Sequence, residues 1–476
     1  MYAPRSGFRH DPRTWIDRAA TLRAAQVRTV LLRRPIDGDA QMLQTEIDGI
    51  LATQTDAGSL GDNTAGRLIR LSRLGCPPDR PEVRQAVTAM CRDDLGEEGR
   101  LGPYEIQAAA WGLLEPLSDQ HASLLAASVE ALARQVMDLD FWCACPWTGE
   151  VHLQGLLSGR QYADVAPALD RGFQVMVDAL GSGTGFPPYL DPWGFLDCAG
   201  RTDHALARQV VLRQVPFILR AQRDDGTWGG PGHLGFGPAD HTFLVVRALL
   251  RHDLLEELRS LPPLPPDWDL GESLPLPPGD FRSLTWDGSH FWLLDAGAPV
   301  ARRLTEKGGS TDRQIDLPEG ANSIGWIGDA LLAVRADPNV LYRICPFSGE
   351  VREETALDFW GDARGVAAVG NRLAIGNLHC GGVHLSDAEG QISPHPHMLA
   401  GSWVTDLTGA GDTIWHLDGF SPALVHSGLD QHHHLLEWGD QPFGESTAGV
   451  AHDGSSLWLL DNDTHRVCSI VGPSAN

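Results

Sequence analysis

Five glycines recur in the C-terminal part of the chain at nearly constant intervals. They occupy positions 288, 328, 370, 411 and 454, so the intervals are 40, 42, 41 and 43 residues. Each glycine opens a short alternating stretch, and two of these stretches, GSHFWLLD from Gly288 and GSSLWLLD from Gly454, are nearly identical. A tight turn and a short strand, repeated about every 40–45 residues, are typical of four-stranded propeller blades. The repeat therefore predicts a five-bladed β-propeller over residues 279–476.

The fifth repeat is short by one strand. Little of the chain follows Val467–Ser469, the last stretch that reads as a strand. We expect Ser273–Leu276 to provide the missing strand and to close the ring. This segment lies in a proline-rich stretch, residues 261–278, whose stiff and extended character marks a boundary between two domains.

Residues 1–260 have a different pattern, in which helical stretches alternate with glycine-containing turns. An apolar helix face from Phe217 ends near Gln222, Gly226 turns the chain, and Trp228 follows. The Gln222 amide can satisfy backbone groups that the helix end leaves unpaired, and Trp228 can pack back over the turn. A weaker copy occurs earlier, at Ile50, Leu51, Gln54, Gly58 and Leu60.

The spacing of Phe217, Ile218, Gln222, Gly226 and Trp228 resembles the QW repeat of the terpenoid cyclase and prenyltransferase superfamily. The resemblance implies that residues 1–260 form an α/α toroid, a double ring of inner and outer helices. Helical hairpins with a period of roughly 40 residues suit such an array. The expected fold class is multidomain α and β, with an N-terminal α/α toroid and a C-terminal five-bladed β-propeller.

The segment Pro238-Ala-Asp240-His241-Thr242 resembles the Asp-x-Asp-Asp-Thr signature of the acid-initiated (class II) terpenoid cyclases. Asp240 takes the middle position, which protonates an alkene or epoxide in that family, and Thr242 is kept, whereas Pro238 and His241 replace the other two aspartates. The resemblance implies that Asp240 is the general acid, with His241 or Glu150 tuning or reprotonating it. Asp240 also suits the N-cap of the following helix, and a purely capping role is the alternative.

His241-Thr242 also resembles the His-Thr pair of the protein prenyltransferases, whose histidine is a zinc ligand. That family carries an Asp-x-Cys motif elsewhere, while this chain has adjacent Asp197 and Cys198. An alternative zinc site of Asp197, Cys198 and His241 follows, because these residue types are ordinary zinc ligands. The acid-initiated reaction itself is expected to need no cofactor.

Several aromatic residues lie at or beside the expected starts of inner helices, around the mouth of the expected cavity. Their ring faces can line a cavity for an apolar small-molecule substrate and can stabilise carbocations by cation–π attraction. The substrate-binding residues expected on this basis are Tyr104, Trp111, Trp142, Trp147, Phe236 and Phe243. Ordinary packing between helices would also use many of them.

The charge of the chain restricts its partners. The net charge is −25, and the 11 Lys+Arg and 27 Asp+Glu residues after Leu270 contribute −16 of it. Nucleic acids and anionic membranes bind clustered Lys and Arg, so neither is an expected partner. The acidic propeller favours a second hypothesis, a non-catalytic scaffold whose propeller binds a protein partner.

The cysteines and the apolar runs bear on localisation. Eight cysteines are scattered along the chain, without a C-x-x-C pair or a disulfide-dense spacing. The first residues lack the apolar core of a signal peptide, and no apolar run is long enough to span a membrane. We expect a cytoplasmic protein with no transmembrane segment.

Overall fold

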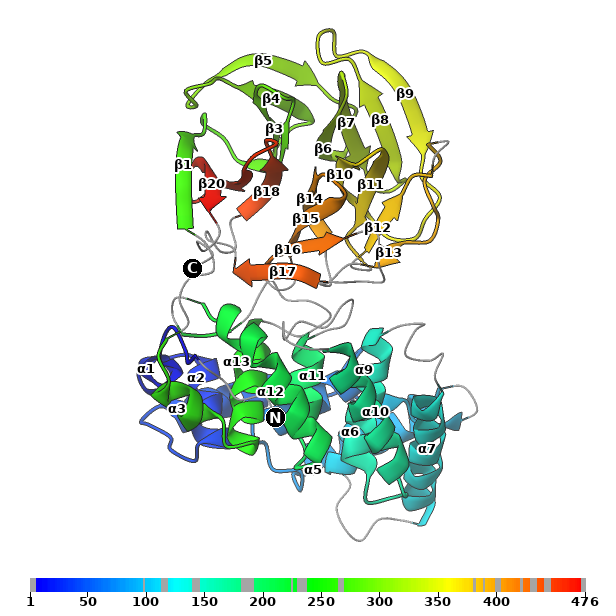
Figure 1. Ribbon diagram of the computed structural model, residues 1–476. Helices are drawn as coiled ribbons and strands as arrows, with labels where there is room; N and C mark the ends of the chain where they lie inside the picture. Colours follow the sequence, from blue (N-terminus) through cyan, green and yellow to red (C-terminus); the bar gives the residue numbers. More distant parts are fainter. Residues whose placement is uncertain are drawn as a thin grey trace. The chain divides into compact units, whose positions relative to one another are not determined.

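The chain divides into two compact units, one of helices and one of β-strands (Figure 1). The computed structural model describes residues 6–96, 99–112, 119–138, 146–180, 192–223, 226–228, 238–263, 269–379, 382–387, 390–398, 404–419, 423–428, 435–440 and 447–471. Each unit has its own buried apolar core.

The first unit consists of short helices joined by tight turns. They are α1 (Pro12–Arg18), α2 (Leu22–Gln26), the π-helical turn η1 (Val27–Leu31), α3 (Asp39–Leu51), α4 (Thr64–Arg73), α5 (Pro81–Asp93), α6 (Pro103–Gly112), α7 (Asp119–Met137), α9 (Pro146–Gly159), α10 (Ala166–Ala179), α11 (Pro192–Ala199), α12 (Ala205–Arg220), α13 (Pro238–Arg251) and α14 (Leu255–Ser260).

Two kinds of helix alternate along this unit. Helices α9, α11 and α13 are buried along most of their described length, whereas α3, α5, α7 and α10 each expose one face. An amphipathic stripe buries one side of a helix, and a helix that is apolar all round must be covered on most sides. Contacts join α4 to α6, α6 to α9, α9 to α11, α11 to α13 and α13 to α2, while α3, α5, α7 and α10 each contact members of this series.

The turns that follow α3 and α12 contain equivalent hydrogen bonds. Gln54 Nε2 donates to the Gly58 carbonyl oxygen (2.9 Å), and Gln222 Nε2 donates to that of Gly226 (3.3 Å). Each amide donates a second time, at 2.8 Å and 2.7 Å, to a carbonyl oxygen of a distant segment. Both glycines have a positive φ, +94° and +84°, which favours glycine. The glutamines therefore satisfy carbonyls of the turn and of a distant segment, rather than those of the helix end.

The second unit is a five-bladed β-propeller of four-stranded antiparallel sheets. Its strands are β1 (Asp269–Pro275), β2 (Phe281–Trp286), β3 (Phe291–Asp295), β4 (Val300–Leu304), β5 (Thr311–Asp316), β6 (Ala321–Ile327), β7 (Ala330–Arg335), β8 (Val340–Ile344), β9 (Val351–Ala356), β10 (Ala363–Val369), β11 (Arg372–Asn377), β12 (Gly382–Leu385), β13 (His397–Met398), β14 (Val404–Ala410), β15 (Thr413–Asp418), β16 (Ala423–Gly428), β17 (Leu435–Asp440), β18 (Thr447–His452), β19 (Leu457–Asp461) and β20 (Arg466–Val471). The inner strands β2, β6, β10, β14 and β18 contact one another in sequence, and β18 contacts β2, so the ring is closed.

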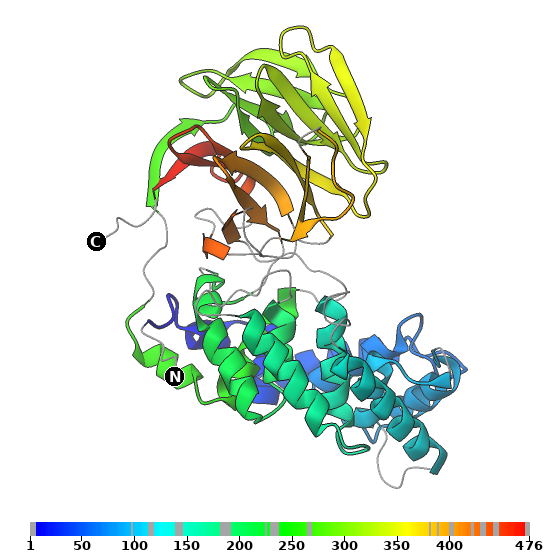
Figure 2. The ribbon, with the colours of Figure 1, turned by 45° about the vertical axis from the view of Figure 1, so that its right-hand side comes forward.

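Strand β1 completes the fifth sheet. The sheet order is β1-β20-β19-β18, with Ser273 opposite Cys468 and Leu274 opposite Val467. In Figures 1 and 2 the green β1 lies beside the red β20. Leu276 just after β1 packs into the apolar cluster between the fifth and first sheets, beside Phe281. The structure thus places the fourth strand of this sheet at 269–275, where the sequence analysis expected it at Ser273–Leu276.

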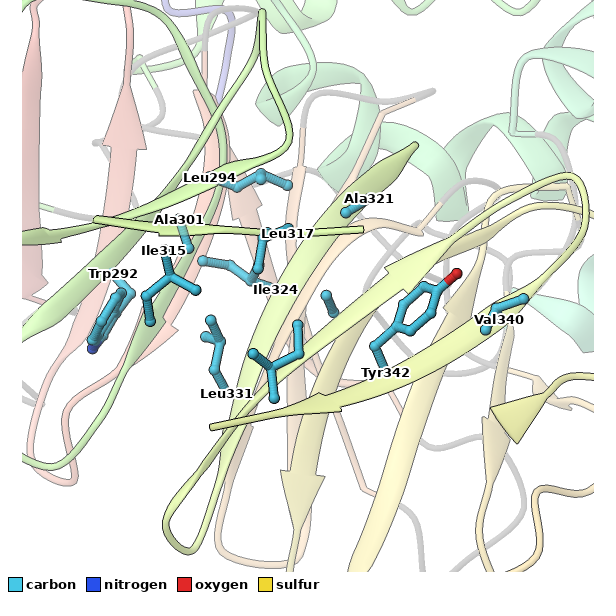
Figure 3. Close-up of a cluster of buried hydrophobic side chains, with 12 residues drawn as sticks. Trp292, Leu294, Ala301, Ile315, Leu317, Ala321, Ile324, Leu331, Val340 and Tyr342 are labelled. Carbon is cyan, nitrogen blue, oxygen red and sulfur yellow. The ribbon is translucent and has the colours of Figure 1, made fainter. Parts of the chain in front are cut away.

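The sheets bury apolar side chains between their faces. Between the first two sheets, Trp292, Ile315, Ile324, Leu331 and Tyr342 belong to one such cluster, whose side chains gather between the strands in Figure 3. Alternate residues of a strand point to the same face, so each sheet supplies apolar residues to both of its neighbours.

The near-identical stretches that begin at Gly288 and Gly454 are held by the same hydrogen bonds. Asp287 Oδ2 accepts from the indole N–H of Trp292 (2.8 Å), and Asp453 Oδ2 accepts from that of Trp458 (2.7 Å). The other oxygen of each aspartate accepts backbone N–H groups of the turn. The aspartate thus satisfies both the turn and a buried indole.

We predict that β1 is required for a stable propeller. A chain of residues 277–476 lacks β1, leaves β20 unpaired and removes two apolar side chains from the cluster near Phe281. It should aggregate, or melt about 10 °C or more below a chain of residues 270–476. Thermal unfolding followed by tryptophan fluorescence measures the difference, and equal melting temperatures would show that closure by β1 is dispensable.

Candidate functional site

The first turn of α13 carries the residues that the cyclase resemblance singled out. Asp240 is the third residue of this helix, which begins at Pro238. The side chain of Asp240 lies outside the described residues, as do Trp142, Phe236 and the side chain of Trp147.

Thr242 fixes the start of α13 to the preceding turn. Its Oγ1 accepts from the backbone N–H of Trp228 (3.0 Å) and donates to the Trp228 carbonyl oxygen (2.9 Å). In the earlier copy, Thr64 Oγ1 accepts from the backbone N–H of Leu60 (3.1 Å). The buried indole of Trp228 also donates to the Ile218 carbonyl oxygen (2.7 Å). These bonds tie α12, the turn and α13 together.

His241 is buried beside an aromatic ring. Its imidazole stacks on Trp193 with 4.6 Å between the ring centres, and Trp193 also packs edge-on against Phe217 at 4.7 Å. Burial, with a smaller contribution from the charge of Arg23, lowers the pKa of His241 to about 3. The imidazole is therefore neutral at physiological pH and can act there as a hydrogen-bonding group, but not as a cationic acid.

Asp197, in the last turn of α11, is surrounded by three arginines. It accepts hydrogen bonds from Arg73 of α4 (3.2 Å), from Arg201 (2.9 and 3.2 Å) and from Arg247 of α13. Arg201 also donates to Ser158 of α9 (3.4 Å). The last turns of α4, α9 and α11 thus meet at one polar cluster, where the negative ends of the helix dipoles favour guanidinium groups.

The cluster carries more positive than negative charge. Burial alone would raise the pKa of Asp197, but the charges of Arg201, Arg247 and Arg73 outweigh it and hold this pKa well below its ordinary value. Burial and the charges of Arg201 and Arg73 lower the pKa of Arg247 to about 10. Asp197 is therefore fixed as an anion among cations, which makes it a structural group.

Cys198 and Glu150 lie next to this cluster. Cys198 Sγ donates to the Glu150 carbonyl oxygen (3.5 Å), and both side chains are buried. Burial raises the pKa of Cys198 well above its ordinary value, and the carboxylates of Asp197 and Glu150 raise it further. A thiol that stays protonated is a poor zinc ligand. The described residues hold no group of three His, Cys, Asp or Glu side chains that could bind a metal, so the zinc alternative gains no support from this geometry.

Three of the expected substrate-binding aromatics are described. Tyr104 and Trp111 of α6 are partly exposed, whereas Phe243 of α13 is buried. The Arg247 guanidinium lies 5.4 Å from the centre of the Phe243 ring. The face of Phe243 thus already attracts a protein cation.

In the propeller, the five inner strands share an irregularity at their N-terminal ends. The register with the neighbouring strand shifts within the first residues of β2, β6, β10, β14 and β18. Such bulges re-aim side chains and are frequent at the rims of closed sheets. The second residues of these strands, which fall in the shifts, are Arg282, Asn322, Arg364, Thr405 and Ala448.

Asp406, the third residue of β14, joins four of the five inner strands. Its carboxylate accepts from the hydroxyl groups of Ser283 (3.0 Å) and Ser323 (2.9 Å) and from the backbone N–H groups of Leu284 (3.4 Å) and Val450 (3.1 Å). These partners belong to β2, β6 and β18. Burial raises the pKa of Asp406 to about 7, although the hydrogen bonds act in the opposite direction.

Glycine at the equivalent position of two other inner strands lets a neighbouring inner strand approach closely. The third residues of β10 and β18 are Gly365 and Gly449, where the other strands carry Ser, Ser and Asp. A Cβ at Gly365 would lie 2.9 Å from the Leu407 nitrogen, and one at Gly449 would lie 2.7 Å from the Leu284 nitrogen. A larger residue at either position would force neighbouring strands apart.

Neither Asp406 nor the arginines around Asp197 were expected from the sequence. Comparing the third residue of each predicted inner strand would have found one acid among two serines and two glycines. No local pattern marks the arginines, because Arg73 and Arg247 lie 124 and 50 residues from Asp197 in the chain.

Comparisons with known proteins give only distant structural similarity, over less than half of this chain. No protein-family model matches it, and no curated protein does. Among solved structures, glutaminyl cyclase of Myxococcus xanthus is 12% identical, with a TM-score of 0.38, over 43% of this chain and 95% of that one. Inactive virginiamycin B lyase of Staphylococcus aureus with quinupristin is 17% identical, with a TM-score of 0.29, over 42% and 68%. PQQ-bound aldose sugar dehydrogenase of Streptomyces coelicolor is 12% identical, with a TM-score of 0.30, over 44% and 99%. Similarity at this level carries no inference about activity.

Across the part of the chain that the structure describes, no helix has the length and apolar character needed to cross a membrane.

We predict that Asp197→Asn destabilises the helical unit by about 3–5 kcal/mol, because it leaves the buried guanidinium group of Arg73 and the partly buried ones of Arg201 and Arg247 without their counter-charge. Urea unfolding followed by the helical circular dichroism signal measures this. Asp203→Asn is the matched control, since Asp203 is exposed and its ion pair with Arg251 is long, at 3.4 Å. Equal destabilisation by both changes would contradict the structural role of Asp197.

We predict that Asp406 makes stability depend on pH. Its folded pKa, about 7, lies above its ordinary value of 3.8. The folded state then binds the proton more tightly than the unfolded state does. Protonated Asp406 therefore contributes up to about 4 kcal/mol to the free energy of unfolding below pH 4, and this contribution is lost as the pH rises through 7. The difference in melting temperature between wild type and Asp406→Asn should fall across this range. Asp412→Asn, an exposed change in the same sheet, should show no such trend, and a constant difference for Asp406→Asn would refute the assignment.

Proposed function

We propose that the helical unit is an α/α double ring of the terpenoid cyclase type. In this proposal it converts an isoprenoid or similarly apolar substrate by acid-initiated cyclisation or rearrangement. The contacts that run from α4 through α6, α9 and α11 to α13 and back to α2 support an inner ring. The hydrogen bond from Gln26 Nε2 to the Arg73 carbonyl oxygen (2.9 Å) links α2 to α4. The amphipathic helices would form the outer ring.

The observation that carries the proposal is the construction of the start of α13. Thr242 holds the turn at Trp228 by two hydrogen bonds, and the adjacent His241 stacks on Trp193. Asp240 precedes these two residues in the same helical turn. An acid at this position is next in sequence to a buried, neutral imidazole and follows the motif of the class II cyclases.

Two forces would act on the pKa of Asp240. The N-terminus of α13 favours the anion, and an apolar, aromatic surround favours the neutral acid. Asp240 can act as a general acid only if the apolar surround outweighs the helix N-terminus and keeps the carboxyl group protonated. A neutral His241 adds no positive charge beside Asp240, which favours the protonated acid over an ion pair.

The polar cluster around Asp197 bears on where a substrate could bind in the helical unit. Arg73, Ser158 and Asp197 lie in the last turns of α4, α9 and α11. Polar side chains therefore fill the interior where these helices end. The proposed substrate space is near the start of α13, where Asp240 lies, while Glu150 lies next to the Asp197 cluster through the bond from Cys198 Sγ to its carbonyl oxygen.

Asp240→Asn is expected to abolish turnover while leaving the fold intact. The amide keeps the size and much of the capping ability of the acid, but loses a general-acid contribution of about 10²–10⁴-fold. The assay incubates the full chain with polyprenyl substrates of several lengths, with and without a chelator, and analyses organic extracts. Asp203→Asn, an exposed acid before α12, should turn over like wild type.

Other outcomes of this assay assign a different function. Retained turnover with a lower melting temperature makes Asp240 a cap, and loss of turnover with chelator favours the zinc-dependent reaction. No product from any substrate favours the second candidate, a scaffold. The observation that favours a scaffold is the charge of −16 on the propeller, which would repel acidic partners and bind basic protein surfaces.

A further inference from the structure

The bulged ends of the inner strands place unlike side chains around one end of the propeller axis. The first three blades present Arg282, Asn322 and Arg364, whereas the fourth and fifth present Thr405 and Ala448. Neighbouring inner strands contact one another around a closed ring. The two arginines and the amide therefore belong to three successive blades and form an arc on one half of this end of the ring, which we call the mouth.

Among the residues that the structure describes, no carboxylate is bonded to either arginine. Arg282 donates to the carbonyl oxygens of Asp295 (3.2 Å) and Ala296. Arg364 makes no hydrogen bond or ion pair in the described structure, and its Nε is buried. Burial and the charge of Arg282 lower the pKa of Arg364, so the two guanidinium groups lie within range of mutual repulsion.

Asn322, between these arginines in blade order, is a second unsatisfied group. Its side chain is 7% exposed, and its Oδ1 is buried without a hydrogen-bond partner. Most buried polar groups in folded proteins are paired, and exceptions are enriched where a ligand or water binds. The arc thus contains a guanidinium group whose buried Nε has no hydrogen-bond partner and an amide whose oxygen has none.

The other charges that face Arg364 are few. Asp406 lies one residue deeper, at the third position of its strand, and influences Arg364 electrostatically. Asp362 also acts on Arg364, but it is partly exposed and lies 3.3 Å from His379 Nε2. Solvent screens Asp362, and Asp406 is neutral below its pKa. Arg282 and Arg364 therefore leave one unit of uncompensated positive charge when Asp406 is ionised and two units when it is protonated.

We propose that this mouth binds the carboxylate group of a small organic monoanion, held by Arg364 and flanked by Arg282. A guanidinium binds a planar carboxylate through two parallel hydrogen bonds, which suits the free donors of Arg364. Together with ionised Asp406, the two arginines carry one net positive charge, which fits a single negative charge better than the double charge of phosphate. The site belongs to the propeller and is independent of the reaction proposed for the helical unit.

Isothermal titration calorimetry on the full chain tests the site, with sodium lactate, sodium succinate and sodium phosphate as probes at constant ionic strength. Lactate should bind saturably to wild type. Arg364→Gln should weaken binding by about 10- to 100-fold. Arg372→Gln, an exposed arginine of β11 in the same sheet, should bind like wild type.

A second measurement covers the case in which Arg364→Gln fails to fold. Phenylglyoxal modifies accessible arginines, and lactate should protect Arg364 but not Arg372 in wild type, as read by peptide mass spectrometry. Absence of saturable lactate binding, unchanged affinity in folded Arg364→Gln, or no protection of Arg364 overturns the proposal. Binding of phosphate in preference to lactate overturns the assignment of a carboxylate.

Discussion

One buried carboxylate sits at the junction of the elements in each unit, and the way its charge is compensated decides what it does. Asp197 connects α11 to α4 and α13 through arginines, and Asp406 connects β14 to β2, β6 and β18 through hydroxyl and N–H groups. Removing a charge from water costs several kcal/mol unless partners replace the solvent. Formal cations lower the pKa of Asp197, whereas dipoles alone leave that of Asp406 raised to about 7. The first is a permanent ion pair and the second a group that can gain or lose a proton.

Much of the propeller could be predicted because its determinants are local. A glycine with positive φ, such as Gly288 or Gly454, fixes a turn, and the following alternation fixes a strand, so five copies define five sheets. A closing strand was expected at Ser273–Leu276 from counting strands, since an unpaired edge is unfavourable, and the strand lies at 269–275. In the helical unit, the Gln54 and Gln222 turns could be predicted in the same way. Whether the helices close into the double ring that the resemblance implies depends on contacts between distant helices, which no short pattern encodes.

The candidate sites were less predictable, for the same physical reason. Asp197 and Cys198 are adjacent in sequence and were considered as ligands of an alternative zinc site, but Asp197 is bonded by arginines that folding brings from far along the chain. His241 was read as a proton-handling group, and burial against Trp193 leaves it neutral. Residue types indicate which chemistry is possible, while burial and distant partners decide the charge state in which each group is held.

The charge of the propeller constrains any ligand of its mouth. With a net charge of −16, the unit repels anions at a distance, so long-range steering works against a carboxylate ligand. Binding must then depend on short contacts in a partly desolvated space, where an interaction with a guanidinium is stronger than at the surface. Repulsion grows with the charge of the ligand, whereas the local attraction comes from Arg364 and Arg282 only. An acidic surface around a basic mouth therefore selects for small monoanions and against polyanions such as nucleic acid.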